Sequence, residues 1–373
     1  MKKRTAKALT LLAIFVLVLS AVYAFAVAVS AARLRKAYAE LEKDGRPMQA
    51  ADIIPPRIPD SENAALLYQS AILLLQAQPA ELGDLLSDLS KRSESLLQGS
   101  IEPNELAALE ELIRQDAVSE ALTILQRGTT RPACRFDRQY NAGFHIDLPM
   151  ADLRHMAQIL YAKARIEARA GHHAAAWELA RTQLKFADAL QYEPIVISQL
   201  VRWRMIRLAC ETIQAICEAG PPEETQLADL MNSLQALDDI RPLLLAVDGD
   251  RLIVGEWLFN LPRHELRKVL RSEVFVENDM SGLHYRALFH WITFRPVFLA
   301  DHAAYLRATR ETSRMVERPY SPDDRKELTS RGHALTRALF PGFYRVKEIC
   351  LESIAQTRIT RAGLTLLRYK QSH

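Results

Sequence analysis

The chain has 373 residues, of which 49% are hydrophobic and 25% charged, so it can bury a sizeable core and does not have the composition of a disordered protein. Of its 48 Lys and Arg residues, seven lie in residues 1–36 beside no acid, which leaves 41 basic against 45 acidic residues in the remainder. That remainder is net acidic, which excludes the basic footprint typical of a nucleic-acid-binding protein.

The first feature along the chain is a long apolar segment near the N-terminus. No charged residue occurs from Ala8 to Ala32. As a helix, this segment would be about 37 Å long, enough to cross a hydrocarbon core of about 30 Å with some tilt. The sequence therefore predicts a cytoplasmic tail at residues 1–7 and a transmembrane helix at residues 8–32, through which the protein binds the membrane.

A cleaved secretory signal is the alternative interpretation of the same segment. The basic residues before it and the small-x-small sequence Ala24-Phe25-Ala26 also fit a signal peptide that is cut near Ala26. The apolar character continues through Val27 and Val29 to Ala32, which favours an uncleaved anchor. The basic tail favours an N-terminus inside, with a single pass through the cytoplasmic (inner) membrane and an extracytoplasmic, periplasmic body; cleavage would give a secreted protein.

Residues 33–60 form a predicted juxtamembrane stub and linker. Leu34, Tyr38 and Leu41 share one side of an amphipathic continuation of the anchor, which Gly45-Arg46-Pro47 ends. The prolines in residues 55–59 predict an extended, semi-rigid segment, because each disfavours helical geometry in the residue before it.

From Asp60 onward the pattern is one helix after another, and we expect a single helical extracytoplasmic domain at residues 61–370. The fold class is all-α, with antiparallel helical hairpins stacked into a compact or gently superhelical bundle. Asp60 or Ser61 is expected to cap the first helix. The expected helices are 61–77, 79–99, 103–127, 149–171, 172–191, 194–219, one through Leu227–Leu237, an apolar stretch 242–259, 283–294, 297–316, 322–339 and one after Gly342.

The segment 128–149 has no helical periodicity, although most other connections in the chain are short. Long ordered loops in compact domains are often functional, and this one has the highest density of polar groups, while Phe136 and Phe144 can attach it to the body. Its candidate ligand-binding residues are Arg131, Arg135, Asp137, Arg138, Tyr140, His145 and Asp147. The alternative is a loop that packs over helices with its charges satisfied locally.

Glu256 is an acid within the apolar run Leu252–Phe259, and a buried acid can be adapted to proton transfer. The structural interpretation is stronger, because ionisable groups in cores are usually paired. It predicts an ion pair between Asp248 and Arg251, three residues apart, and a partner such as Arg202 or Arg241 for Glu256.

No nucleotide-binding, zinc-protease or serine-hydrolase motif occurs in the chain, so no catalytic residue, cofactor or metal site is predicted. The histidines are dispersed. The four cysteines are too scattered for a disulfide framework and are interpreted as helical thiols: Cys134, Cys210, Cys217 and Cys350.

Several features in the same order resemble a group of uncharacterised bacterial envelope proteins with a single span and an α-helical extracytoplasmic body. They are the short basic tail, the span, the break at Gly45-Arg46-Pro47, the Pro-x-x-x-Asn-Ala-Ala start at residues 59–65, and Arg131-Pro132-x-Cys134-Arg135-Phe136. The last helix, with Arg361 to Tyr369, is similar too. The resemblance implies architecture and location but no activity.

These observations favour a membrane-anchored envelope protein that acts as a protein-interaction or scaffolding module, with a protein partner in the envelope and no nucleic acid or metal. The alternative is an extracytoplasmic hydrolase or ligand-binding enzyme that uses the 128–149 loop or the acids around Glu256.

Overall fold

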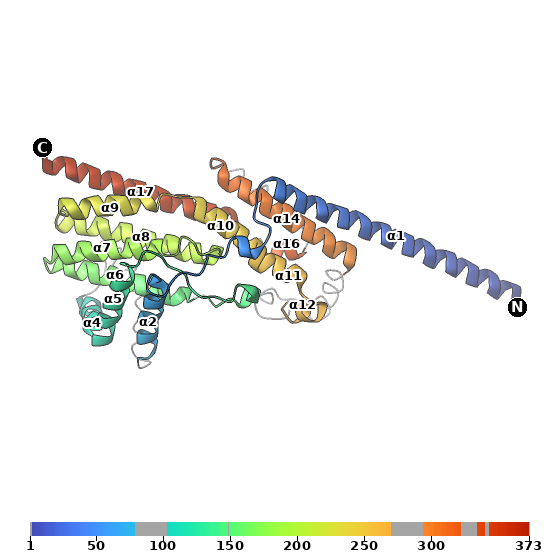
Figure 1. The fold of residues 1–373 in the computed structure, drawn as a ribbon, viewed down its shortest axis with the longest axis horizontal. Coiled ribbons are helices and arrows are strands. Elements are labelled where there is room, and N and C mark those ends of the chain that lie inside the picture. The colour runs from blue at the N-terminus through green and yellow to red at the C-terminus, as the bar shows by residue number, and fades with distance from the viewer. Residues whose placement is uncertain are drawn as a thin grey trace. The chain divides into compact units, whose positions relative to one another are not determined.

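The computed structural model describes residues 2–78, 103–147, 149–269, 294–321, 334–339 and 343–372 (Figure 1). These residues form helices and no strand; one isolated parallel β-bridge joins Asn63 to Ala133. The expected all-helical fold class with one long apolar N-terminal helix is therefore confirmed. The chain divides into two compact units.

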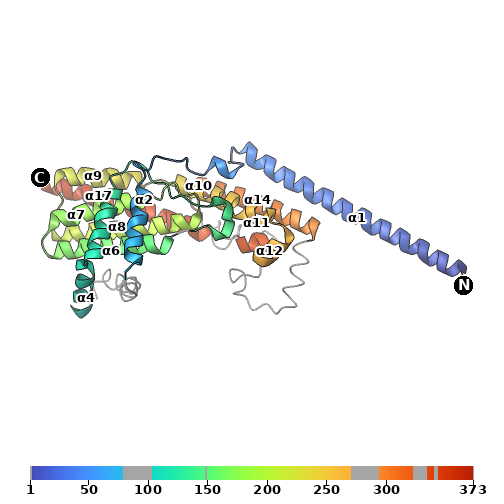
Figure 2. The ribbon, with the colours of Figure 1, turned by 60° about the horizontal axis from the view of Figure 1, so that its bottom comes forward.

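Unit 1 comprises the residues up to Ile53, Asn141–Phe144 and Val247–Tyr344. Its two long helices, α1 (Lys2–Lys43) and α14 (Arg295–Glu317), lie side by side in Figures 1 and 2 and make the most extensive helix pair among the described residues. Its smaller elements are η1 (Ala50–Asp52), the end of α10 (Arg241–Gly249), the π-helix η3 (Asp250–Gly255), α11 (Glu256–Asn260), α12 (Arg263–Val269) and α16 (Ala334–Leu339).

Unit 2 comprises Ile54–Tyr140, His145–Ala246 and Arg345–His373. Its elements include α2 (Ala64–Gln76), α4 (Pro103–Arg114), α5 (Asp116–Gly128), α6 (Met150–Arg169), α7 (His173–Asp188), α8 (Val196–Ala219), α9 (Glu224–Ala236) and most of α17 (Phe343–Ser372). Helices α6, α7 and α8 all pack against one another, as Figure 2 shows, and α2 packs on α5. The core contains large buried side chains such as Trp177, Tyr161 and Phe186.

Some predicted boundaries are wrong. Asn63, rather than Asp60 or Ser61, caps α2, because its side chain accepts a hydrogen bond from the backbone N–H of Ala65 at 3.1 Å. The helix expected at 103–127 is broken at Gln115, whose ψ of 135° is not helical, so it forms α4 and α5. The helices expected at 79–99 and 283–294, and the start of the one at 322–339, lie outside the described residues.

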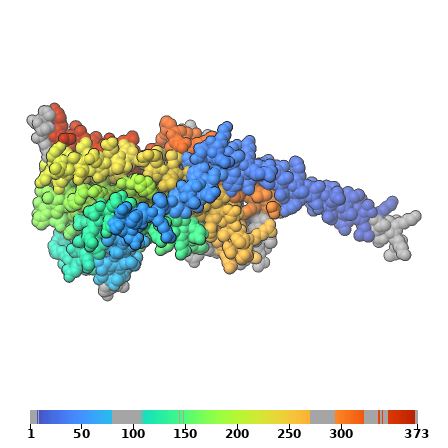
Figure 3. All heavy atoms as spheres, in the orientation of Figure 1, coloured from blue at the N-terminus to red at the C-terminus, as the bar shows by residue number. Residues whose placement is uncertain are grey.

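Helix α1 changes character along its length without a break. From Leu9 to Phe25 all its large apolar side chains are exposed, and Figure 3 shows the N-terminal part of the helix projecting beyond the rest of unit 1. From Ala26 onward one stripe of the helix is covered, with Ser30, Ala37 and Leu41 buried. Leu34 and Tyr38 are partly buried on the same core, so the predicted inner face of the stub is confirmed.

Substituting Leu41 by alanine should destabilise unit 1 selectively. Leu41 is 1% exposed and lies in a core cluster with Leu258, Phe259 and Leu306, so the cavity should cost about 2–5 kcal/mol. Hydrogen exchange of the full-length protein in detergent should become faster in α14 and stay unchanged in α7. The matched control is Leu17→Ala, since Leu17 lies on the same helix but is 71% exposed. Equal effects of the two changes would contradict the burial of residue 41.

Candidate functional site

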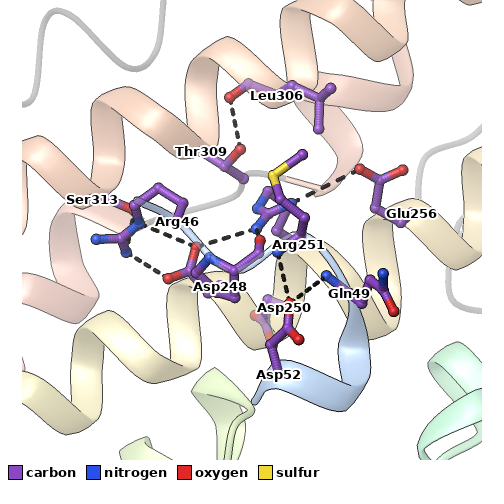
Figure 4. Close-up of polar contacts among 12 residues, drawn as sticks. Arg46, Gln49, Asp52, Asp248, Asp250, Arg251, Glu256, Leu306, Thr309 and Ser313 are labelled. Atoms are coloured by element: carbon purple, nitrogen blue, oxygen red, sulfur yellow. Dashed lines mark hydrogen bonds and ion pairs between the residues drawn. The ribbon is translucent and has the colours of Figure 1, made fainter. Parts of the chain in front are cut away.

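A network of buried charges in unit 1 joins the end of the anchor helix to the helices around it. The Arg251 side chain is fully buried and lies 3.5 Å from Asp248 and 4.0 Å from Glu256 (Figure 4). It also donates to the backbone carbonyl of Pro47. On the other side of Asp248, Arg46 forms a 2.6 Å ion pair with that carboxylate and donates to Ser313 of α14 at 3.0 Å. Two cations and two carboxylates therefore compensate one another in the interior.

Burial raises the pKa of Asp248, and the nearby charges of Arg46 and Arg251 act in the opposite direction. For Glu256, burial also opposes ionisation, but contacts with His302, Tyr38 and Arg251 prevail and lower its pKa. Glu256 is therefore held as a carboxylate, which balances the positive charge of Arg251.

The π-helix η3 explains how Arg251 and Glu256 come together. Residues five apart in an α-helix lie about 140° apart around the axis, on different faces. A turn that is widened to i→i+5 hydrogen bonds brings them nearly onto one face. Gly255 permits the close packing that accompanies this turn, because a Cβ atom there would lie 2.1 Å from the hydroxyl of Tyr305. The π-turn thus has an identifiable role in the charge network.

Glu256 also contacts a tyrosine of the anchor helix and a histidine of α14. Tyr38 donates to Glu256 Oε2 at 2.7 Å, and the Nε2 atom of His302 lies 3.0 Å from the same oxygen. The His302 ring stacks on Phe259, with centroids 4.4 Å apart. The three polar side chains are largely buried, so this group joins α1, α11 and α14 and gives little access to a substrate.

The predicted arginine partners of Glu256 are wrong, whereas the predicted pair of Asp248 and Arg251 is confirmed. Arg202 lies 3.5 Å from Asp188, and Arg241 lies 2.8 Å from Asp239. Sequence reasoning missed Arg46 and His302 as members of the network. The available signals were the Gly45-Arg46-Pro47 break and the position of Tyr38 on the buried face of the stub.

Outside this network, Gly143 of the loop at residues 128–149 belongs to unit 1. Its φ is +59°, and a Cβ atom there would lie 2.1 Å from the ring of Trp257, so only glycine fits both the conformation and the contact.

In unit 2, the candidate loop is hydrogen-bonded to the start of α2. The Asn63 side chain donates to the carbonyl of Arg135 at 2.8 Å and accepts from its N–H at 2.9 Å. The N–H of Ala64 donates to the carbonyl of Ala133 at 2.8 Å. The Arg135 side chain in turn donates to the carbonyl of Pro55 at 2.8 Å. The motifs at residues 59–65 and 131–136 therefore meet, and Arg135 of the second motif also holds the proline-rich segment.

Arg138 is a second structural arginine of the loop. Its side chain is 3% exposed, pairs with buried Glu193 at 3.1 Å and donates to the carbonyl of Asp147. Its guanidinium also lies over the ring of Phe136, 4.7 Å from the centroid. Burial raises the pKa of Glu193, an effect that the charge of Arg138 opposes. Arg138 therefore closes the loop on itself and attaches it to the helical core.

The structure brings four of the seven candidate ligand residues together. Asp137, Arg138, His145 and Asp147 line one groove of about 650 Å³ beside α2. Arg131 lines a separate groove of about 320 Å³ with Cys134 and Tyr68. Arg135 and Tyr140 line neither groove, and Tyr140 is buried, which raises its pKa. The candidate set is thus not a single site.

The cysteines offer no activated nucleophile. All four are free thiols, and burial raises the pKa of each; for Cys210 and Cys217 it rises to about 11. Within the described ranges, no group of three or more His, Cys, Asp or Glu side chains has the arrangement of a metal site.

The chain matches no protein-family model, no curated protein and no solved structure. The described helices include one, at the N-terminus, that is long and apolar enough to cross a membrane, and a signal sequence has the same properties.

Replacing Arg251 by methionine should destabilise unit 1 by about 3–5 kcal/mol, because Asp248 and Glu256 would keep buried carboxylates without their shared cation. The matched control is Arg314→Met. Arg314 pairs with Asp44 in the same unit but is 50% exposed, so its loss should cost about 0–1 kcal/mol. The loss of stability in each variant is measured by urea unfolding of the full-length protein, with hydrogen exchange in α14 as the readout for unit 1. An Arg251 variant as stable as the Arg314 variant would refute a central role for the network.

Proposed function

We propose that this protein is a membrane-anchored envelope protein whose helical body binds another protein or organises a complex beside the membrane. The observation that carries the proposal is the change in α1 from an exposed apolar segment to a buried, ion-paired one. Residues 9–25 expose a continuous apolar surface of the kind that lipid or a partner covers. The same helix continues into the core of unit 1 through Ala37 and Leu41.

The exposed length of α1 supports an anchor. The segment 8–25 would be about 27 Å long, close to the hydrocarbon thickness of about 30 Å. The part of α1 that packs against the rest of unit 1 would then begin where the bilayer ends, near Ala26, so the span would be shorter than residues 8–32. Tyr23, whose ring lies 5.4 Å from that of Phe294, suits the interface between lipid and water.

Ion pairs attach the end of the anchor helix to α14. Arg310 contacts Glu40 at 2.6 Å and Asp44 at 2.7 Å, and hydrogen bonds from Arg310 and Arg314 lower the pKa of Asp44 to about 2. Together with Arg46 and Arg251, they leave unit 1 no flexible connection to the anchor. Unit 1, held in this way, suits the positioning of a partner at a fixed height above a membrane.

Cleavage near Ala26 is the competing fate of the segment. The apolar character of residues 27–32 does not distinguish the two fates, because Ser30 is buried in unit 1 and Val27 and Val29 are partly covered there. Retention is instead supported by the continuity of α1 through Ala24, Phe25 and Ala26 and by the contact of Tyr23 with Phe294.

We further propose that unit 2 is a stack of antiparallel helical hairpins with a gentle superhelical curvature. The mutual packing of α6, α7 and α8 and their short connections support this arrangement. Stacked hairpins without a catalytic constellation are typical of interaction modules.

A ligand-binding or hydrolytic role is the second candidate. The shared groove of Asp137, Arg138, His145 and Asp147 favours it. It ranks below the first because Arg138 is already paired with Glu193, and Arg135 holds the proline-rich segment. These arginines are used to fold the loop.

Topology and retention of the anchor are tested separately. An alkaline phosphatase fusion after residue 60 should be active, and a fluorescent protein that matures only in the cytoplasm should stay dark at the same site; the opposite pair of results would reverse the orientation. N-terminal sequencing of the mature protein should find residues 1–26 present. A mature chain that begins at Val27 and washes free of membranes would establish a cleaved signal.

Partner binding is tested with the full-length protein, tagged at the N-terminal tail and solubilised from membranes with detergent. Affinity purification after mild crosslinking should recover at least one protein in near-stoichiometric amount. A chimera in which residues 1–32 carry an unrelated soluble domain is the control, because it keeps the anchor and loses the body. A monomeric protein that recovers nothing beyond this control would overturn the proposed function.

A further inference from the structure

The last helix, α17, has an apolar stripe that its own unit does not cover. Five exposed residues follow one another at alternating intervals of four and three along this helix: Ala355, Ile359, Ala362, Leu366 and Tyr369. Ile359, Leu366 and Tyr369 are 66%, 69% and 62% exposed. This spacing is that of the a and d positions of a coiled coil. We call these five residues the α17 seam.

The seam is not needed to hold α17 in place. Another face of the helix is buried in unit 2 through Ile354, Thr357 and Leu364. Two ion pairs tie the helix to its surroundings: Arg358 lies 2.8 Å from Asp238, and Arg368 contacts Glu224 of α9. The helix is therefore fixed on one side and presents a preformed apolar surface on the other.

Charge in this part of the chain has one sign. From residue 355 to residue 372 there are four basic residues and no acid: Arg358, Arg361, Arg368 and Lys370. Lys370 occupies the position that directly follows a seam residue, where coiled coils place the charges that select a partner. Arg358 also flanks the seam but is already paired with Asp238. The complement of this surface is a helix with apolar a and d positions and acidic flanks.

We propose that the α17 seam is a docking site for an acidic amphipathic helix of another protein. The proposal rests on the proposed function and specifies the chemistry of its partner. The small residues Ala355 and Ala362 let a second helix approach closely, while Ile359 and Leu366 supply the apolar contacts. The net positive charge of residues 355–372 favours an acidic partner and speeds its association.

Two other occupants fit the observations less well. A helix that lies in a membrane surface buries a broad apolar face, whereas the seam is the narrow a and d stripe typical of helix pairing. A second copy of α17 would bring two basic helices together, which opposes self-association. Both remain distinguishable outcomes of the experiment.

The test uses full-length protein in detergent and three labelled synthetic peptides of equal length. The first has Leu and Ile at a and d with Glu at e and g, the second has Lys in place of Glu, and the third is a scrambled acidic sequence. Fluorescence anisotropy should show that the acidic amphipathic peptide binds about tenfold or more tightly than either of the others. Raising the salt from about 50 mM to about 500 mM should weaken its binding several-fold.

Variants locate the binding surface. Ile359→Ser combined with Leu366→Ser should weaken the acidic peptide about tenfold or more, without changing thermal unfolding, because both residues are exposed. Leu73→Ser is the matched control, since Leu73 is 63% exposed on α2 of the same unit. Equal binding of the acidic and basic peptides, or an equal loss with Leu73→Ser, would overturn the proposal.

A photo-crosslinker placed at residue 359 identifies the occupant in cells. Crosslinks to an acidic helical segment of another protein would support the proposal; crosslinks to a second copy of this chain or to lipid would refute it.

The double variant distinguishes a failure of the α17 seam from a failure of the proposed function. If it still recovers the full complement of partners in the affinity purification, the seam is excluded and the proposed function stands. If the unmodified protein recovers no partner, the proposed function itself fails.

Discussion

The buried guanidinium of Arg251 connects segments that are distant in the sequence. It contacts the carbonyl of Pro47 after the anchor helix, Asp248 at the end of α10 and Glu256 at the start of α11. A cation without exposed surface must be compensated where it lies, so these three segments can be placed only together. Arg46 extends the requirement to α14. Unit 1 is therefore specified by charge compensation as much as by apolar packing.

Much of the fold could be predicted from one sequence, because helical periodicity and end signals are local. The inner face of Leu34, Tyr38 and Leu41 and the pair of Asp248 with Arg251 depend on spacings of three, four and seven residues. The contact of Arg251 with Glu256 could not be predicted in this way. It requires a π-turn, and no sequence signal distinguishes that turn from an ordinary α-helical turn around Gly255.

The candidate loop illustrates the same limit. Its lack of periodicity and its polar density were visible in the sequence, but its contacts were not. Asn63 lies 72 residues before Arg135. Its side-chain amide bonds the backbone carbonyl and N–H of Arg135, as a neighbouring strand would do with its own backbone. Polar density alone does not separate groups that bind a ligand from groups that fold the chain. In this loop, Arg135 and Arg138 belong to the second kind.

Because α1 is one continuous helix, its packing in unit 1 fixes both the axial position and the rotation of its exposed part. Each residue of an α-helix advances the chain by about 1.5 Å and turns it by about 100°. Inserting one residue between Phe25 and Ser30 would therefore swing every side chain from Leu9 to Phe25 to a new azimuth relative to α14. The number of residues between an exposed side chain and Ser30 therefore fixes the direction in which that side chain faces. Two chains with identical apolar composition and different phase would present different surfaces to their surroundings.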